Sequence, residues 1–167
     1  MNFVRQVFTG CRLLERCCGV VPPSGPNDPI LVICGEAPGR TEDLVGEPFA
    51  GRSGEVLDDA LHLIQVPRRQ IRILNVLGCA PPYDRDPRPD EIKACRTAWI
   101  QAEIDQHKNV PWVLLGATAI KAIGGASHGV RNNIWASWVS PDGLRVHAVY
   151  HPAAILRGMS RTDVLAD

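Results

Sequence analysis

The sequence predicts an α/β protein with three layers, in which helices cover both faces of a central, mostly parallel four-stranded sheet. Three short runs rich in apolar residues are expected to be strands: residues 30–34, whose composition indicates a strand buried on both faces of a sheet, residues 71–76, and residues 112–115, a further buried strand. A helical pattern follows each of these runs. This alternation of strands and helices is typical of a parallel sheet covered by helices on both sides.

Length and composition indicate one globular domain that spans residues 1–167. Apolar residues make up 45% of the chain, and no apolar run approaches the roughly 20 residues that a membrane helix needs. Residues 1–8 lack the continuous apolar stretch of a secretion signal. We therefore expect a cytoplasmic protein without membrane contact, and we expect it to act as a monomer. Because 18 basic residues balance 18 acidic ones, binding of phosphate groups requires a local patch of charge.

Three helices are expected between and after these strands. The first begins with Ser53 as its N-cap, carries apolar residues on one side as far as residue 64, and cannot continue through Pro67. The second covers residues 89–106 and has a proline and two acidic residues in its first turn. The third covers residues 117–123 and stops at two glycines.

The last strand of the sheet is expected to enter through a hairpin-like excursion. Residues 133–139 and 144–150 have strand composition, and they flank the sequence Ser-Pro-Asp-Gly at residues 140–143. These four residue types together favour a tight turn.

Two polar segments follow predicted strands, and each contains a side chain suited to chemistry. Glu36 lies in the segment 35–43 after the first strand, and His151 lies in the segment 149–157 after the last one. In an open α/β sheet the loops at the carboxyl ends of the strands build the site. We therefore expect Glu36 and His151 to share one cleft.

Four motifs occur in order along the chain, each at or near a predicted strand end or helix start. They are Gly35–Gly39 with Glu42 and Asp43, the segment 46–54, Asn75-Val76 with Cys79–Pro82, and His151-Pro152.

In this order and spacing, the motifs resemble the iron–sulfur branch of the uracil-DNA glycosylase superfamily over roughly residues 11–157. The resemblance implies a DNA repair enzyme that flips uracil out of DNA and hydrolyses its N-glycosidic bond to leave an abasic site. Its partner would be uracil-containing DNA. The alternative is a catalytically altered member that binds such DNA or excises another modified base.

The resemblance gives catalytic roles to Glu36 and His151. Breaking an N-glycosidic bond leaves positive charge on the sugar and negative charge on the departing base, so the site needs an anion-stabilising donor and a placed water. His151 would stabilise the oxyanion of uracil, and Glu36 would hold the attacking water. On its own, His151 also suits a helix-start histidine bonded to the backbone. Glu42 is a secondary candidate for the water site.

The resemblance also implies residues that hold the base. Phe49 would be the aromatic surface on which the flipped uracil stacks, and Asn75 would read the O4/N3 edge of the base. Without the resemblance, Phe49 suits a loop residue that plugs the core and Asn75 suits a turn cap. The remaining residues expected at the substrate are Gly35, Ala37, Pro38 and Gly39.

Two further segments are expected to contact DNA. Ile155 or Leu156 would be the wedge that fills the gap left by the flipped base, with Arg157 on a phosphate. Arg52 and Ser53 lie at a helix N-terminus that suits phosphate binding. The segment 153–157 also suits the start of a docked helix.

The cysteines match the pattern of the family only in part. By resemblance, Cys11, Cys79 and Cys95 are ligands of a [4Fe-4S] cluster, but Phe8 stands where the first family cysteine is expected. We take Cys17 as the fourth ligand. Neighbouring Cys18, a ligand other than cysteine, a zinc ion, or loss of the metal are the alternatives. The sixth cysteine, Cys34, is expected to pack in a core strand.

Overall fold

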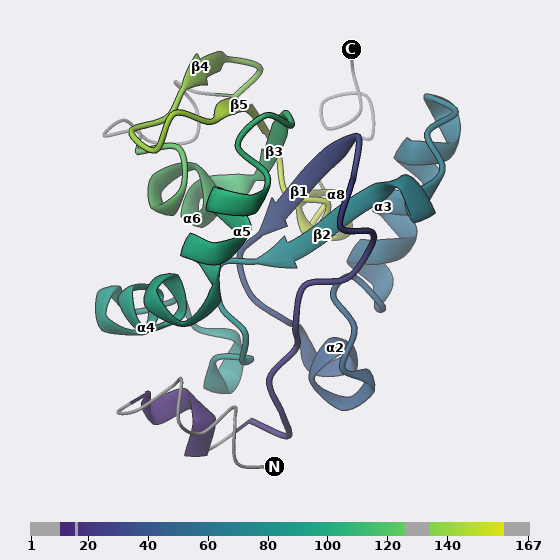
Figure 1. Cartoon of the computed structure of the whole chain (residues 1–167). Helices are drawn as coiled ribbons and strands as arrows, with labels where there is room; N and C mark the ends of the chain where they lie inside the picture. Colours follow the sequence, from purple (N-terminus) through teal and green to yellow (C-terminus); the bar gives the residue numbers. More distant parts are fainter. Residues whose placement is uncertain (1–10, 16, 126–133, 159–167) are drawn as a thin grey trace.

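A twisted five-stranded sheet lies at the centre of the computed structural model, which describes residues 11–15, 17–125 and 134–158 (Figure 1). The strand order within these residues is β2-β1-β3-β5-β4. All neighbouring pairs are parallel except β4 and β5, which are antiparallel. The strands are β1 (Leu31–Gly35), β2 (Ile71–Asn75), β3 (Trp112–Leu115), β4 (Ser137–Val139) and β5 (Arg145–Val149).

The predicted α/β class and the mostly parallel sheet are confirmed, but the predicted number of four strands is one too small. The additional strand is β4, which belongs to the expected hairpin-like excursion. The turn at residues 140–143 folds the chain back, and Ser140 closes it by accepting the backbone N–H of Gly143 and donating its own to Leu144. Antiparallel pairing with β5 then places β4 at the edge of the sheet. Residue 133, the predicted start of this strand, lies outside the described residues.

Helices pack on both faces of the sheet (Figure 1). Among the described residues, no helix is long and apolar enough to cross a membrane. The helices are α2 (Arg40–Val45), α3 (Arg52–Leu63), α4 (Pro89–Cys95), α5 (Gln101–Gln106), α6 (Gly116–Ala122) and α8 (Ala153–Leu156), with short turns η1 (Arg12–Glu15), η2 (Arg68–Gln70), η3 (Pro82–Asp84) and the π-helical turn η4 (Arg96–Ile100).

The start of α3 differs from the prediction, in which Ser53 was the N-cap. Gly51 occupies the cap position, and Ser53 lies inside the first turn of the helix. The backbone N–H of Gly51 donates to Oε1 of Glu42 at 2.8 Å. A carboxylate from another helix therefore binds the backbone at this helix start, in the place where a local cap was expected.

The predicted helix 89–106 is one helical path with a change of geometry in its middle. The π-helical turn η4 separates α4 from α5. Arg96, the first residue of this turn, donates to both carboxylate oxygens of Asp142 at 2.6 Å and to the carbonyl oxygen of Ala122 at 3.0 Å. Arg96 thereby connects η4 to the β4–β5 turn and to the end of α6.

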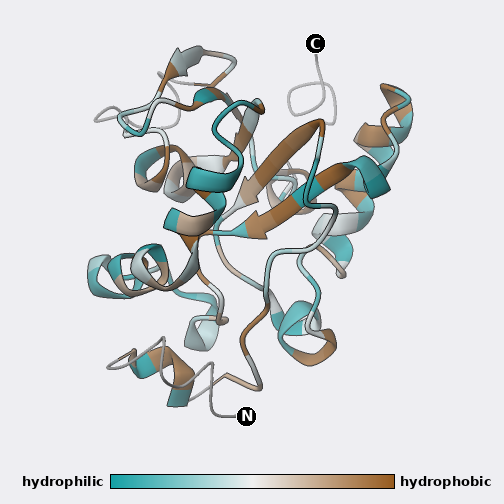
Figure 2. Ribbon diagram, viewed as in Figure 1, coloured by the Kyte–Doolittle hydropathy of each residue, from teal (hydrophilic) through white to brown (hydrophobic). Residues whose placement is uncertain are grey.

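Alternating residues of the strands fill two separate cores. In β1, Val32 and Cys34 pack on the face that α5 and α6 cover, whereas Ile33 packs on the face that α3 covers. Figure 2 shows the consequence as hydrophobic colouring along β1 and β2. The expectation that Cys34 serves packing is confirmed, because it is fully buried in the larger core.

Strand order also determines where a site can form. Strand β1 has β2 on one side and β3 on the other, so the direction in which the chain adds strands reverses at β1. Ligands bind outside the carboxyl ends of the strands at such a reversal. Gly35 and Asn75 are the last residues of β1 and β2, and they lie side by side in register at this edge.

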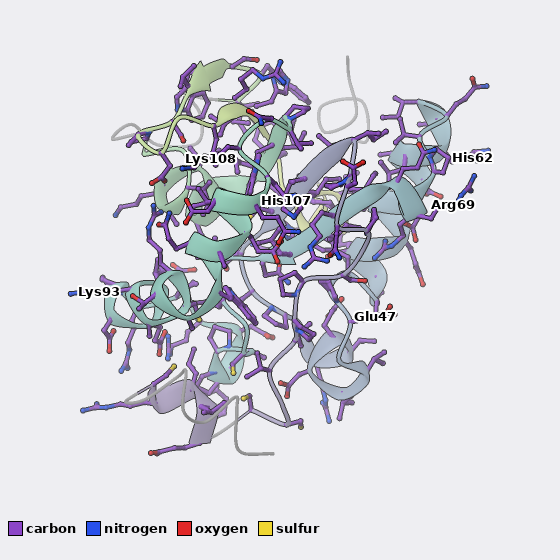
Figure 3. The ribbon with its side chains drawn as sticks, viewed as in Figure 1. Glu47, His62, Arg69, Lys93, His107 and Lys108 are labelled. Atoms are coloured by element: carbon purple, nitrogen blue, oxygen red, sulfur yellow. The ribbon has the colours of Figure 1, made fainter. Side chains whose placement is uncertain are left out.

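A buried ionic network connects β2 to α5 on the opposite side of the sheet from α3. Arg72 donates from Nε and Nη2 to the two carboxylate oxygens of Glu103, at 2.9 and 2.6 Å. His107, labelled in Figure 3, lies beside the same carboxylate, with its Nε2 3.5 Å from Oε2 of Glu103. Only 14% of the Arg72 side chain and 10% of the Glu103 side chain are exposed.

We predict that Glu103→Ala lowers the free energy of unfolding by about 3 kcal/mol, because removing one partner leaves a buried guanidinium without its counter-charge. Urea unfolding monitored by circular dichroism measures this change. The control is Asp105→Ala on the same helix, which removes the exposed pair with Lys108 and is expected to change stability by less than about 0.5 kcal/mol. Equal effects of the two substitutions would contradict the prediction.

Candidate active site

A cavity of about 640 Å³ opens at the carboxyl ends of the parallel strands. This volume lies in the range of pockets that hold small organic ligands. Its wall includes Glu36 after β1, Phe49 before α3, Asn75 at the end of β2 and His151 after β5. The cleft expected for Glu36 and His151 is therefore present, and it also contains the aromatic ring and the amide that the sequence singled out.

The other predicted site residues divide into two groups. Ala37, Pro38, Gly39, Ser53 and Arg157 lie in the cavity wall, as does Glu42. Outside the wall formed by the described residues are Gly35, Arg52, Ile155 and Leu156. Gly35 lies directly behind the wall, whereas Arg52 and Leu156 are exposed.

His151 is half-buried, and its ring is fixed from two sides. Its Nδ1 accepts the backbone N–H of Ala153 at 3.1 Å, the bond expected of a histidine at a helix start. Its ring also stacks on Phe49, with 5.7 Å between centroids and 27° between planes. Burial lowers the pKa of His151 to about 4, and the charge of Arg157 adds to this effect. The ring is therefore neutral at pH 7, and because Nδ1 accepts, its proton lies on Nε2.

Glu36 is oriented by a residue that the sequence analysis did not identify. The hydroxyl group of Thr118, on α6, donates to Oε2 of Glu36. This bond joins residues on different elements. Among the described residues, the other carboxylate oxygen, Oε1, accepts no hydrogen bond, and Glu36 lies in the cavity wall. The carboxylate thus has one oxygen bound to the protein and one suited to a ligand or a water.

Asn75 is buried, with 5% of its surface exposed, and its Oδ1 has no hydrogen-bond partner among the described residues. A buried amide oxygen without a partner is costly unless a ligand supplies the donor. Gly35 makes room for this amide. A Cβ at position 35 would lie 2.4 Å from Oδ1 of Asn75 and 2.7 Å from Cζ of Phe49.

Phe49 combines the two roles that the sequence left open. It is 4% exposed and packs in the core beneath α3, and it also contributes to the cavity wall. Its backbone has a φ of 55°, in the left-handed region that residues with a Cβ rarely adopt.

Glu42, the secondary candidate for the water site, has a structural partner in the same loop. Its carboxylate accepts the backbone N–H of Gly51, two residues after Phe49.

The four cysteines proposed as cluster ligands belong to one apolar cluster with Leu13 and Leu77. Cys11, Cys79 and Cys95 are buried, and Cys17 is half-buried with its Sγ 2.7 Å from Sγ of Cys79. This hydrogen bond lowers the pKa of Cys17 and raises that of Cys79. Phe8 lies outside the described residues.

The donor set fits an iron–sulfur cluster in its chemistry, because such clusters are held by thiolates. The cysteine side chains are not arranged for metal binding, however, because within the described residues no three potential ligands are placed to hold a metal ion. Thiolates bound to different iron atoms could not keep the 2.7 Å separation of Cys17 and Cys79. Cys18 is exposed, and its backbone N–H donates to Asp43, which also raises the pKa of its thiol.

The comparison with known families agrees with this geometry. The family profile described as "Uracil DNA glycosylase superfamily" matches residues 22–166. The chain belongs to this superfamily. The family resemblance drawn from the four motifs is therefore confirmed.

Curated relatives place this superfamily member near the type-4 branch. The "Type-4 uracil-DNA glycosylase" of Thermotoga maritima is 36% identical, over 95% of this chain and 84% of the relative. The protein of the same name from Archaeoglobus fulgidus is 33% identical, over 93% of this chain and 82% of the relative. A "Type-5 uracil-DNA glycosylase" of Pyrobaculum aerophilum is 26% identical, over 86% of this chain and 70% of the relative.

We predict that the ring of His151 titrates near pH 4, well below the value of about 6.5 of an unfolded chain. Because the unfolded state binds this proton more readily, the stability that the neutral ring contributes is present above pH 6.5 and is lost as the pH falls toward 4. NMR titration of the ring protons, assigned with a His151→Gln variant, measures the midpoint. A midpoint near 6.5 would contradict the buried, neutral ring.

Proposed function

We propose that this protein is a monofunctional uracil-DNA glycosylase of base excision repair, a single-domain monomer of the cytoplasm that hydrolyses the N-glycosidic bond of deoxyuridine in DNA. The observation that carries the proposal is the convergence of Glu36, Phe49, Asn75 and His151, from four separate segments, on one cavity. The names of the type-4 relatives support the same activity.

In the proposed reaction the uracil leaves the DNA stack and enters the cavity. Extrusion of a base costs a few kcal/mol, and stacking on an aromatic ring returns roughly 1–3 kcal/mol. Phe49 supplies this ring. On the pyrimidine edge, Oδ1 of Asn75 accepts N3–H and the amide nitrogen donates to O4. The missing partner of Oδ1 supports this pairing, because N3–H is the donor that it lacks.

Bond breaking then separates charge between the sugar and the base. The electron pair of the C1′–N1 bond moves onto uracil, and Nε2–H of His151 donates to the O2 atom, where the negative charge develops. The bond from Ala153 to Nδ1 keeps the proton on Nε2. A neutral histidine suits this role because it stabilises the anion without having to lose its proton.

Glu36 acts on the water that completes hydrolysis. Its free oxygen accepts a hydrogen bond from the water and directs the oxygen of the water to C1′, while Thr118 holds the other oxygen of the carboxylate. The hydroxyl group adds to C1′, and the remaining proton passes to the carboxylate and from there to solvent. The uracil anion takes up a proton from solvent, so that free uracil and an abasic site result.

The proposed path of the DNA crosses the mouth of the cavity between α3 and α8. Arg157 lies in the cavity wall and would contact a phosphate group beside the flipped nucleotide. Arg52 and Ser53, at the start of α3, would bind a second phosphate. Leu156 is 40% exposed on α8, so it is better placed than half-buried Ile155 to enter the gap in the stack.

We also propose a [4Fe-4S] cluster held by Cys11, Cys17, Cys79 and Cys95, which would link the segments on either side of η1, the β2–α4 loop and the end of α4. Three of these thiols are buried together with the fourth beside them, which supports the ligand set. Cys79 follows Asn75 by four positions, so the ligands would stabilise the loop after the base-reading residue. When bound, the cluster supplies a structural cross-link.

The glycosylase activity is tested with a labelled oligonucleotide that carries one uracil, followed by alkaline cleavage at abasic sites. We expect cleavage at the uracil position with the wild-type protein and a loss of at least about 100-fold with His151→Ala, since one oxyanion donor is worth about that factor. Equal product from both proteins would contradict the role of His151. Uracil-dependent binding without product from the wild-type protein would instead indicate a binding module.

The fourth cluster ligand is tested by comparing Cys17→Ala with Cys18→Ala. We expect anaerobically purified wild-type protein and Cys18→Ala to show the visible absorbance and iron content of a cluster, and Cys17→Ala to lose most of both, because three thiolates hold the cluster poorly. Full iron in Cys17→Ala, or its loss only in Cys18→Ala, would show that the ligand set is wrong.

A further inference from the structure

The guanidinium group of Arg68 binds the loop that presents Phe49. Arg68 begins the turn η2, directly before β2. Its Nη2 donates to the carbonyl oxygens of Pro48 and Phe49, at 2.9 and 3.2 Å. Its Nη1 donates to Oδ1 of Asp58, on α3, at 2.7 Å. One side chain thus joins the Phe49 loop, α3 and the start of β2.

The Phe49 loop needs such a partner because its conformation is unfavourable. The φ of 55° at Phe49 places its Cβ close to the following carbonyl group. The loop also packs tightly, since a Cβ at Gly54 would lie 1.8 Å from the carbonyl oxygen of Phe49. A residue other than glycine keeps a left-handed backbone conformation only where its surroundings determine that conformation. Bonds from Arg68 to two successive carbonyl oxygens provide such a determinant.

Arg68 acts at a distance from the cavity. It lies outside the cavity wall formed by the described residues, and its side chain is 35% exposed. It therefore has no contact with a base bound between Phe49 and Asn75. Its effect on the site is transmitted through the backbone of the Phe49 loop, to which it is bound.

We propose that Arg68 is a positioning residue for Phe49, oriented by Asp58, and that it fixes the ring where the extruded uracil stacks. The proposal rests on the glycosylase function proposed above. The planar fork of arginine can bind a carboxylate and carbonyl oxygens at the same time in fixed directions. Lysine at this position would keep the charge and the pairing with Asp58 but would not span all three acceptors.

The variants are chosen to separate charge from geometry. Arg68→Ala removes the group, and Arg68→Lys retains its charge. The matched control is Arg69→Ala, since Arg69 is the exposed neighbour in the same turn and is labelled in Figure 3. Thermal unfolding of each variant establishes that it is folded at the assay temperature.

Loop order is measured first, without a catalytic readout. Hydrogen–deuterium exchange of the peptide that contains residues 46–54 is expected to become faster in Arg68→Ala and Arg68→Lys and to stay unchanged in Arg69→Ala. Exchange at the wild-type rate in Arg68→Ala would overturn the proposal, because the loop would then not depend on the guanidinium group.

The uracil-excision assay is then run as a double-mutant cycle with Phe49→Leu. We expect Arg68→Ala and Arg68→Lys to lower kcat/KM roughly tenfold in the wild-type background, since charged hydrogen bonds of this kind carry an effect of about that size. In the Phe49→Leu background the further loss is expected to be less than about twofold, because the ring to be positioned is absent.

The outcomes distinguish this proposal from the function on which it rests. A full additional loss in the Phe49→Leu background would show that Arg68 acts by another route and would overturn the proposal. If the wild-type protein excises uracil and Arg68→Ala does so equally well, the role of Arg68 is overturned and the glycosylase function stands. A wild-type protein that releases no uracil would overturn the glycosylase function, and the role of Arg68 in catalysis with it.

Discussion

The close approach of β1, β2 and the Phe49 loop at Gly35 is the constraint on which the site depends. Parallel pairing brings Gly35 beside Asn75, and the missing side chain lets the amide and the aromatic ring occupy the same narrow space. The ring of His151 stacks on Phe49 and so joins the same group of contacts. A reversal of strand order gives the cavity its location, and this contact gives it its shape.

The sequence was sufficient for the features that depend on local pattern. The apolar runs of β1 and β3 are continuous, and that of β2 is interrupted only by Arg72, because both faces of the sheet are covered. The carboxyl ends of β1, β2 and β5 carry Glu36, Asn75 and His151 to one edge. The missed strand β4 is short, and its residues alternate between exposed and half-buried, so its pattern indicated a hairpin arm without settling its place in the sheet.

The contacts that orient the site lie beyond what local pattern can indicate. Thr118 binds Glu36 across 82 positions of the chain, and Arg68 binds the Phe49 loop across about twenty. Ser53 is a residue type preferred at N-caps and precedes an apolar stripe, yet the N-cap is Gly51, whose backbone N–H is bound by Glu42. Such contacts depend on how the helices pack on the sheet. Because many other side chains in the sequence could form a contact of the same kind, the sequence does not single out the ones that do.

The hydrogen bond from the backbone N–H of Ala153 to Nδ1 of His151 makes the position of the proton on this ring depend on helix α8. The amide that occupies Nδ1 belongs to α8, the same four-residue helix that presents Leu156 to solvent. In the proposed reaction, one end of this helix meets the gap in the DNA while the other selects the tautomer that meets the departing base. The tautomer of His151 is therefore already set before DNA binds, by the same helix that carries the residue proposed to fill the gap in the DNA.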